Sequence, residues 1–322
     1  MIGPRCVALT GLNTFVGQRL AERLLALPEP PRLVGIDLRQ PLDLEGRIAF
    51  RPLDLTRATA DGELATMLAD EHVEAVVHLA FRSSPTANLE YDHELETLGS
   101  LHVMHACSAA KVGRLVLASS TMLYGPDSTN PNFLHEERAL GGHADAPGIQ
   151  NRVEAEGLLA HWAPRHPDVQ VCVLRHCWVM GPTYSDHVVR YFDRPVVPVV
   201  LGYDPLMQFI HEGDLVSVFE KATLESHPGV YNVVGRGVVP LSMLLALAGK
   251  RSLPLPGWLL HRMPSVHSQG QAGDLPEGFF DYLRHLWVAD GERGWQAFGE
   301  PVYTTKEAWI SFVSSRRTER FD

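Results

Sequence analysis

The sequence predicts an α/β protein in which helices cover both faces of a parallel β-sheet. Short apolar segments alternate with helical patterns through the first half of the chain. Each apolar segment is nearly continuous, which is typical of a strand buried on both faces. Right-handed crossovers between such strands build a doubly wound sheet. With 322 residues, of which 45% are hydrophobic, the chain can bury a core of this kind.

The elements of the first half come in the order that this arrangement requires. The predicted strands are residues 5–10, 32–37, 47–51, 74–79, 113–119 and 169–175. Helical patterns cover residues 16–27 and 95–111, the second with apolar residues at helical spacing. Residues 1–178 are therefore predicted to form the first domain.

The pattern changes after about residue 178. Prolines break the segment 182–208, and region 251–278 is rich enough in proline and glycine to predict loop or short helix. Regular elements are predicted at 213–224 (helix), 230–234 (strand), 241–249 (helix) and, as two helical stretches, within 279–312. We expect a smaller C-terminal lobe over residues 179–322, interleaved with the end of the first domain.

Composition argues against several classes of protein. A formal net charge of −10 disfavours a nucleic-acid partner, since binding phosphates needs a basic face. No apolar run is long enough to span a membrane, and the N-terminus does not resemble a secretory signal, so we expect a cytoplasmic protein. The histidines are scattered and predict no metal site. The cysteines stand singly in apolar runs, which predicts buried free thiols: Cys6, Cys107, Cys172 and Cys177.

A glycine-containing turn joins the first predicted strand to the first predicted helix. Gly11 permits a tight turn, and the helix N-terminus that follows offers amides and a positive dipole end to a pyrophosphate. This pattern predicts a dinucleotide-binding Rossmann domain. The residues expected at the pyrophosphate are Gly11, Asn13, Thr14, Phe15, Val16 and Gly17.

Two nearby positions refine the choice of cofactor. Asp37 ends the second predicted strand, about 20 residues after the glycine turn, where a carboxylate accepts from the ribose hydroxyls of NAD and repels a 2′-phosphate. Arg39 partly offsets that repulsion, so NAD is favoured over NADP without being required. Thr14 stands where a second glycine would approach the pyrophosphate; its methyl group crowds this approach, while its hydroxyl can donate to a phosphate.

The sequence resembles the extended short-chain dehydrogenases/reductases, specifically the NAD-dependent epimerase/dehydratase family. The resemblance covers most of the chain, and the segments that carry it are residues 10–17, 54–55, 77–80, 96–100, 119–125, 174–182 and 208–215. It implies adenine contacts for Asp54 and Leu55 and a nicotinamide-side backbone at Leu79 and Ala80. Glu96 replaces an asparagine of the family pattern.

The same resemblance implies a catalytic site that this chain lacks in part. In the family a serine polarises the substrate oxygen, a tyrosine transfers its proton, and a lysine four residues later lowers the tyrosine pKa and binds the nicotinamide ribose. Ser120 occupies the serine position. Residues 153–159 resemble the family's helix that carries the lysine, and this alignment places Gly148 at the tyrosine and Arg152 at the lysine. Arg152 can still bind ribose.

Other residues are candidates for the missing proton transfer. His143 lies in a preceding glycine-rich loop, where a neutral-pH base is possible but a solvated loop histidine is the simpler interpretation. Tyr124 is interpreted as a packed aromatic near the nicotinamide side rather than as a proton donor. His176 and Cys177, which follow the sixth predicted strand, are further candidates.

The substrate and the activity stay open at this point. Thr121 and Met122 stand where sugar-nucleotide dehydratases of the family carry Asp-Glu, and Met207 replaces an arginine that often binds a nucleotide diphosphate. With Leu206, Trp178, Phe192 and Trp258 in the second half, we expect a small, apolar, non-nucleotide substrate. The hypotheses are an oxidoreductase with atypical acid/base groups, a cofactor-binding sensor or assembly protein without turnover, and non-redox chemistry in the same pocket.

The resemblance also implies a homodimer. Members of this family commonly pair through two long helices, here predicted near 95–111 and 151–162. We expect Leu158, Leu159 and Trp162 to be exposed apolar residues on the second of these.

Overall fold

A computed structural model describes residues 3–82, 88–260, 275–276 and 278–318. Its main sheet has seven parallel strands in the order β11-β6-β5-β4-β1-β2-β3. The strands are β1 (Cys6–Thr10), β2 (Arg32–Asp37), β3 (Ala49–Pro52), β4 (Ala75–His78), β5 (Arg114–Ser120), β6 (Gln170–His176) and β11 (Gly229–Val233). Their side chains are mostly buried, which explains why the sequence segments are continuously apolar.

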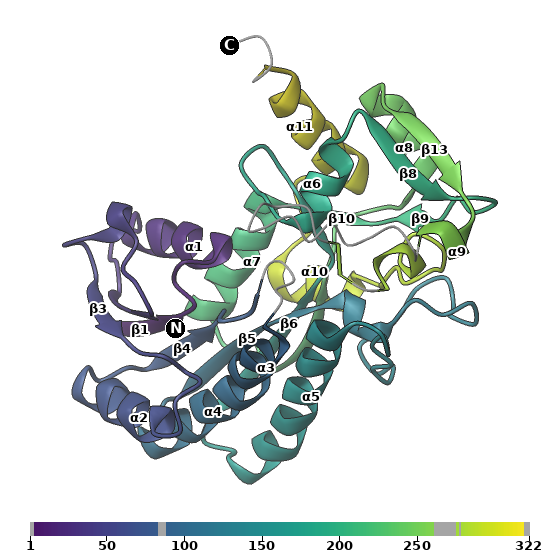
Figure 1. The fold of residues 1–322 in the computed structure, drawn as a ribbon. Helices are drawn as coiled ribbons and strands as arrows, with labels where there is room; N and C mark the ends of the chain where they lie inside the picture. The colour runs from purple at the N-terminus through teal and green to yellow at the C-terminus, as the bar shows by residue number, and fades with distance from the viewer. Residues whose placement is uncertain (1–2, 83–87, 261–274, 277, 319–322) are drawn as a thin grey trace.

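Helices cover both faces of this sheet, so the predicted doubly wound fold is confirmed (Figure 1). On one face α1 (Phe15–Leu25) packs beside α7 (Glu212–Leu224). On the other face, α4 (Gly99–Ala109) lies between α2 (Ala60–Asp70) and α5 (Pro147–Trp162).

The helix predicted over 95–111 differs from the prediction in its first part. A short α3 (Leu89–His93) leads into a π-helical segment, Glu94–Leu98, and only then into α4. The amide of Gly99 accordingly donates to the carbonyl of Glu94, five residues earlier. Such wide turns are rare and occur frequently at functional sites.

The second half of the chain adds three small strand pairs. These are β7 (Trp178–Met180) with β10 (Phe209–His211), β9 (Leu206–Met207) with β12 (Val239–Pro240), and β8 (Val196–Val200) with β13 (Arg251–Leu255). The loop expected at 251–255 is therefore wrong, because β13 pairs with β8 despite Pro254. The strand expected at 230–234 is β11 of the main sheet.

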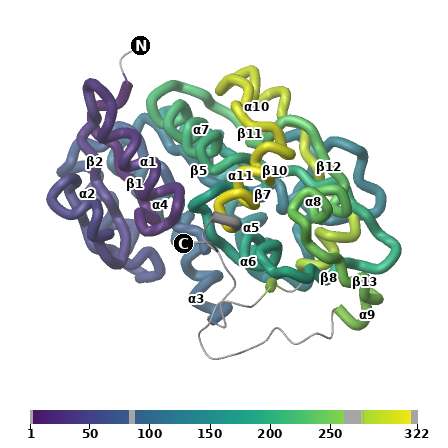
Figure 2. Tube along the Cα trace, turned by 90° about the horizontal axis from the view of Figure 1, so that it is seen from above, coloured from purple at the N-terminus to yellow at the C-terminus, as the bar shows by residue number. Residues whose placement is uncertain are grey.

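The remaining helices belong mainly to this second half. The α-helices are α6 (His187–Asp193), α8 (Leu241–Ala248), α9 (Gly257–Leu260), α10 (Glu292–Phe298) and α11 (Thr305–Thr318). Short 3-10 turns lie at Leu42–Leu44, Thr121–Tyr124, Ala163–Arg165 and Phe279–Asp281. Figure 2 shows α2 and the first strands at one end of the molecule, with α8, α9 and β13 at the other.

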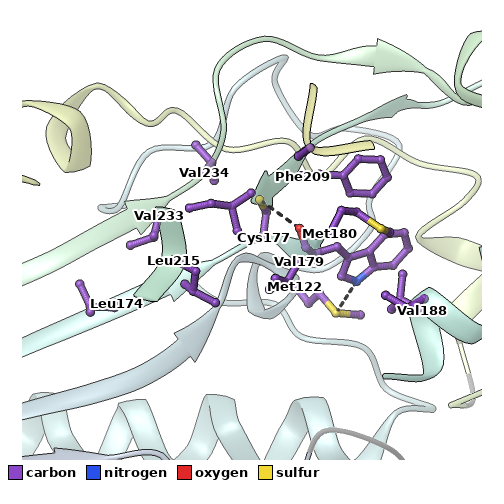
Figure 3. Packing of buried hydrophobic residues seen from close by; sticks show 14 of the residues in the cluster. Met122, Leu174, Cys177, Val179, Met180, Val188, Phe209, Leu215, Val233 and Val234 are labelled. Atoms are coloured by element: carbon purple, nitrogen blue, oxygen red, sulfur yellow. Dashed lines mark hydrogen bonds between the residues drawn. The ribbon is translucent and has the colours of Figure 1, made fainter. Parts of the chain in front are cut away.

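A continuous apolar core joins the two halves. Figure 3 shows Met122, from the first half, among Val179, Met180, Val188 and Phe209 from the second. In the same core the Trp178 indole donates to Met122 Sδ at 3.0 Å, and its ring stacks on Phe279 with 5.5 Å between centroids. This packing fixes the ends of β5 and β6 against the second half of the chain.

The exposed apolar face expected on α5 is not present as predicted. Leu159 and Trp162 are 3% and 6% exposed, because both pack into the protein's own core, and Trp162 also stacks on His166. The homodimer stays a prediction without that support.

Within the described residues, no helix is long and apolar enough to cross a membrane. The four cysteines are free and buried.

Candidate active site

The glycine turn after β1 needs glycine at two positions. Gly11 has a φ of +72°, and a Cβ atom there would lie 2.5 Å from the Leu79 carbonyl carbon and 2.6 Å from the Ala80 nitrogen. A Cβ on Gly17 would lie 2.6 Å from the Gly11 carbonyl oxygen. These close approaches bring the turn, the first turn of α1 and the end of β4 together.

Thr14 is the N-cap of α1. Its hydroxyl donates to the Gly11 carbonyl at 2.8 Å and accepts from the Gly17 amide at 3.1 Å. The hydroxyl hydrogen of Thr14 is therefore already donated within the turn. In this conformation it is not available for the expected hydrogen bond to a phosphate. With a φ of −69°, the backbone here does not require the glycine that Thr14 replaces.

Asp37 ends β2 and holds the turn in place. Its carboxylate accepts from the amides of Asn13, at 2.9 Å, and Leu38, at 2.7 Å. The Asn13 side chain in turn donates to the carbonyl of Arg39 at 2.6 Å. A carboxylate has about four acceptor positions, so Asp37 can still accept from ribose hydroxyls.

The loop after β3 holds the two residues expected at the adenine. Asp54 accepts from the amide and hydroxyl of Thr56 at 3.0 and 2.8 Å. Leu55 is buried and packs against Gly99 at the start of α4.

A cavity of about 570 Å³ opens where the first turn of α1 meets the ends of β4, β5 and β6. It is lined by residues from both halves of the chain, including these predicted site residues: Asn13, Thr14, Phe15, Val16, Leu79, Ser120 and Arg152. Tyr124 and His143 are not among the residues that line it. Neither are Asp37, Asp54, Leu55 and Ala80, which lie at or beyond the strand ends outside it.

Ser120 is the last residue of β5 and lies in register with His176 of β6. Its oxygen accepts from the Met122 amide at 3.1 Å, which leaves its O–H available to donate into the cavity.

Burial lowers the pKa of His176 to about 4, so this ring is neutral at pH 7. Its Nδ1 faces the Cys177 carbonyl at 2.8 Å and must donate there. Burial also raises the pKa of the Cys177 thiol to about 12, which makes it unreactive.

Arg152 projects from α5 toward the cavity. Its guanidinium donates to Glu96 Oε1, at 3.3 Å from Nε and 3.2 Å from Nη2, and also to the Arg82 carbonyl. It lies over the Phe81 ring at 5.3 Å. Gly148 lies one helical turn earlier and also lines the cavity.

Tyr124 and His143 are both occupied elsewhere. The Tyr124 hydroxyl donates to Asn232 at 2.8 Å and accepts from Arg175 at 3.0 Å, and burial raises its pKa above the usual value. His143 Nε2 lies 3.0 Å from Asp281. Its Nδ1 accepts from the Asp145 amide at 3.2 Å. The structure thus places Tyr124 as a packed aromatic and His143 as a partnered loop histidine.

Several side chains expected at the substrate lie outside the cavity. Trp178 lines it, but Met207 and Phe192 are buried in the core and Trp258 is 65% exposed. The sequence pattern marked these residues as apolar but did not reveal which of them face a ligand.

A buried polar chain beside the turn was missed by the sequence analysis. Thr10 Oγ1 lies 2.6 Å from His78 Nδ1, and His78 Nε2 lies 3.0 Å from Ser100 Oγ. Ser100 then donates to the Glu96 carbonyl at 2.5 Å. Burial lowers the pKa of His78 to about 3, so the chain is uncharged. It links β1 to the π-helical segment.

Gly11→Ala should weaken NAD binding by at least about tenfold, because the φ of +72° and the clash with Leu79 displace the turn. Calorimetric titration of NAD into both proteins measures the change. Gly46→Ala is the control, since its φ is also +72° but none of the described residues beyond its chain neighbours lies within 4 Å of its Cβ position. Equal losses of affinity in the two variants would contradict a specific role for the Gly11 turn.

Comparison with known proteins now identifies the family. A model described as the NAD dependent epimerase/dehydratase family matches residues 7–234. The chain belongs to this family. The matched region runs from β1 through β11 and includes Ser120, Gly148 and Arg152.

Related sequences give less detail about the reaction. An uncharacterised protein of Mycobacterium tuberculosis (strain H37Rv) is 28% identical over 324 residues, which cover 97% of this chain and 84% of that protein. An L-arabinose 1-dehydrogenase (NAD(P)(+)) of Haloferax volcanii is 31% identical over 122 residues, covering 35% of this chain and 47% of that enzyme.

Solved structures share the fold. A UDP-glucose 4-epimerase of Thermotoga maritima, with UDP-glucose, has a TM-score of 0.74 at 16% identity, covering 98% of this chain and 99% of that one. A dTDP-glucose 4,6-dehydratase of Bacillus anthracis, with NAD, has a TM-score of 0.72 at 16% identity, covering 98% and 97%.

Proposed function

We propose that this protein is an NAD-dependent oxidoreductase that acts on a hydroxyl or keto group of a small, non-nucleotide substrate. The observation that carries the proposal is the cavity itself, in which Ser120 and the first turn of α1 face the same space. A hydroxyl that can polarise a substrate oxygen is thereby combined with a dinucleotide-binding turn. The proton acceptor differs from the family pattern, because Gly148 and Arg152 hold the tyrosine and lysine positions.

The residues present fit a dinucleotide. The turn at Gly11 leaves no space for a side chain against Leu79, as a backbone that approaches a pyrophosphate requires. Asn13, Phe15 and Val16 would hold the pyrophosphate, Asp37 the adenosine ribose, and Arg152 the nicotinamide ribose. When bound, NAD supplies the acceptor for a hydride from the substrate carbon.

The cavity wall supports a small substrate with one or two polar groups. Apolar side chains such as Trp178, Ile149 and Leu275 line part of it and would contact the carbon skeleton, while polar groups such as Ser120 would bind the reacting oxygen. UDP-glucose is present in one of the named structural neighbours, the Thermotoga maritima epimerase. Here Met207, at the position where family members often carry a diphosphate-binding arginine, is buried in the core.

A cofactor-binding protein without turnover is the second candidate. It is favoured by one observation, the absence of a phenol at position 148 and of an ammonium group at position 152. Reduction of NAD to NADH in the presence of a panel of secondary alcohols distinguishes the two candidate functions. Turnover above the uncatalysed rate supports the oxidoreductase, whereas tight NAD binding with no turnover on any alcohol supports the second candidate.

NAD should bind more tightly than NADP, because the Asp37 carboxylate accepts from ribose hydroxyls and repels a 2′-phosphate. Asp37→Ala should reduce or remove this preference. Calorimetry with each cofactor measures it, and Asp43→Ala is the control, because Asp43 is an exposed carboxylate of the Leu42–Leu44 turn rather than of the end of β2. Equal affinities of the wild type for both cofactors would contradict the role given to Asp37, and no binding of either would contradict the cofactor site.

A further inference from the structure

Glu96 is a buried carboxylate at the wall of the cavity. It is 1% exposed and lies in the π-helical segment between α3 and α4. Its Oε1 accepts from the Arg82 amide at 3.0 Å and from Arg152 Nε and Nη2 at 3.3 and 3.2 Å. One oxygen of the carboxylate is therefore fully engaged by donors, and Arg152 balances its charge.

The other oxygen, Oε2, has no hydrogen-bond partner among the described residues, although it is buried. Buried polar atoms in native proteins are nearly always hydrogen-bonded, and leaving one without a partner is costly. Beyond the helix's own backbone and the adjacent residues, the one described atom within 4 Å of an added Cβ at Gly148 is this same Oε2, at 3.9 Å. The missing side chain of Gly148 thus leaves space directly beside the unpartnered oxygen.

The other two carboxylates at the cavity, and His176, already have partners. Asp186 accepts from the Val189 amide at 2.8 Å and from the Tyr184 hydroxyl at 3.3 Å. Asp92 pairs with Arg82 at 3.5 Å. His176 is neutral and bonds the Cys177 carbonyl. Glu96 differs from these groups because a whole carboxylate oxygen is left without a partner.

We propose that Glu96 is the proton acceptor of this site, and that Oε2 receives the hydrogen of a substrate hydroxyl lying beside Gly148. The substrate class is a primary or secondary alcohol, or the matching carbonyl compound in the reverse direction. This assignment rests on the proposed function. As the substrate O–H bond breaks, its proton would pass to Oε2 and its electron pair would form the carbonyl, and bound NAD would supply the two-electron acceptor for the hydride released from carbon. Arg152, at the lysine position of the family pattern, holds the carboxylate that replaces the phenol.

Glu96→Gln provides a test that needs no turnover. Arg82 and Arg152 both donate toward the Oε1 position, so the amide oxygen must lie there and the NH₂ group takes the place of Oε2. The substitution therefore turns an acceptor into a donor. We expect wild type to bind cyclohexanol more tightly than cyclohexanone, and Glu96→Gln to reverse this order.

Saturation-transfer NMR measures the affinities for both ligands. The measurement is made first without cofactor and then with a cofactor that cannot react with the ligand, which is NADH for cyclohexanol and NAD for cyclohexanone. An identical order of preference in wild type and Glu96→Gln would overturn the proposal.

A second test uses stability and leaves Glu96 intact. Gly148→Ser places a hydroxyl within reach of Oε2, whereas Gly148→Ala makes the same change to the helix without that hydroxyl. Alanine is the better helix former, so propensity alone predicts a higher Tm for the alanine variant. We expect instead that the serine variant melts a few degrees higher, because it satisfies the unpartnered oxygen. A serine variant that melts at or below the alanine variant would show that Oε2 is not open toward Gly148.

Rates separate this proposal from the proposed function. On an alcohol that wild type oxidises, Glu96→Gln should lower kcat by about 10²–10⁴-fold, the usual contribution of a general base. Wild-type turnover with an unchanged kcat in Glu96→Gln would overturn the role of Glu96 and leave the oxidoreductase standing. Absence of turnover in wild type would instead count against the proposed function, and the binding order and the Tm pair would still decide whether Oε2 accepts a ligand hydroxyl.

Discussion

Replacing Arg175 with methionine should lower the free energy of unfolding by about 3–5 kcal/mol. Arg175 and Glu156 form an ion pair in which both side chains are buried, with Nη2 and Oε2 2.6 Å apart. Glu156 also accepts from the Ser119 hydroxyl, and Arg175 donates to Tyr124 and to the Glu136 carbonyl. Removing the cation leaves a buried carboxylate without its counter-charge, which is the costly way to break such a pair.

Urea unfolding of both proteins measures this loss. Arg57→Met is the matched control, because its pair with Glu63 is largely exposed and should change stability by no more than about 1 kcal/mol. A loss in Arg175→Met as small as that of the control would show that the buried network adjusts to the missing charge. The same network explains why Tyr124 is unsuited to proton transfer, because its hydroxyl is hydrogen-bonded to Arg175 and Asn232.

Ser120→Ala should lower kcat for alcohol oxidation by about 10²–10³-fold, the usual effect of losing one donor to a developing negative charge on oxygen. Ser120 lines the cavity with its O–H free to donate, so the loss should fall mainly on kcat rather than on KM. Steady-state formation of NADH measures both constants.

Thr121→Val is the control for Ser120→Ala. It removes a neighbouring hydroxyl that is fully buried, lies outside the cavity and has no hydrogen-bond partner among the described residues. We expect its kcat to stay close to that of wild type. If Ser120→Ala retained full kcat, the reacting oxygen would have to bind elsewhere in the cavity.

The sequence predicted the sheet well because its signal is local. A buried parallel strand is a continuous apolar run, and β1, β2 and β6 lie where such runs were read. The pairing of β8 with β13 was missed because Pro198 and Pro254 interrupt both segments, and proline disfavours strands unless a suitable partner is available. That partner lies far away in the sequence.

For the candidate site, too, features set by local sequence could be predicted, whereas features set by distant contacts could not. Gly11, Ser120 and Arg152 could be found from motif spacing. The substitution at Glu96 was also visible, but its meaning was not, because the unpartnered oxygen results from packing against Arg152 and Gly148 more than fifty residues later. Tyr124 was read as packed, yet the reason, its bond to Asn232 of β11, emerges only when that distant strand joins the sheet.

The position of β11 has a consequence for how the chain is made. During synthesis, β1 to β6 emerge from the ribosome before residues 212–233 do. In the folded protein, however, α7 covers β4 and β5, and β11 pairs with the outer edge of β6. A nascent chain therefore carries an open strand edge and an uncovered apolar face until α7 and β11 have emerged. Both are surfaces to which other unfinished chains can attach. Protection by a chaperone during synthesis matters most in that interval.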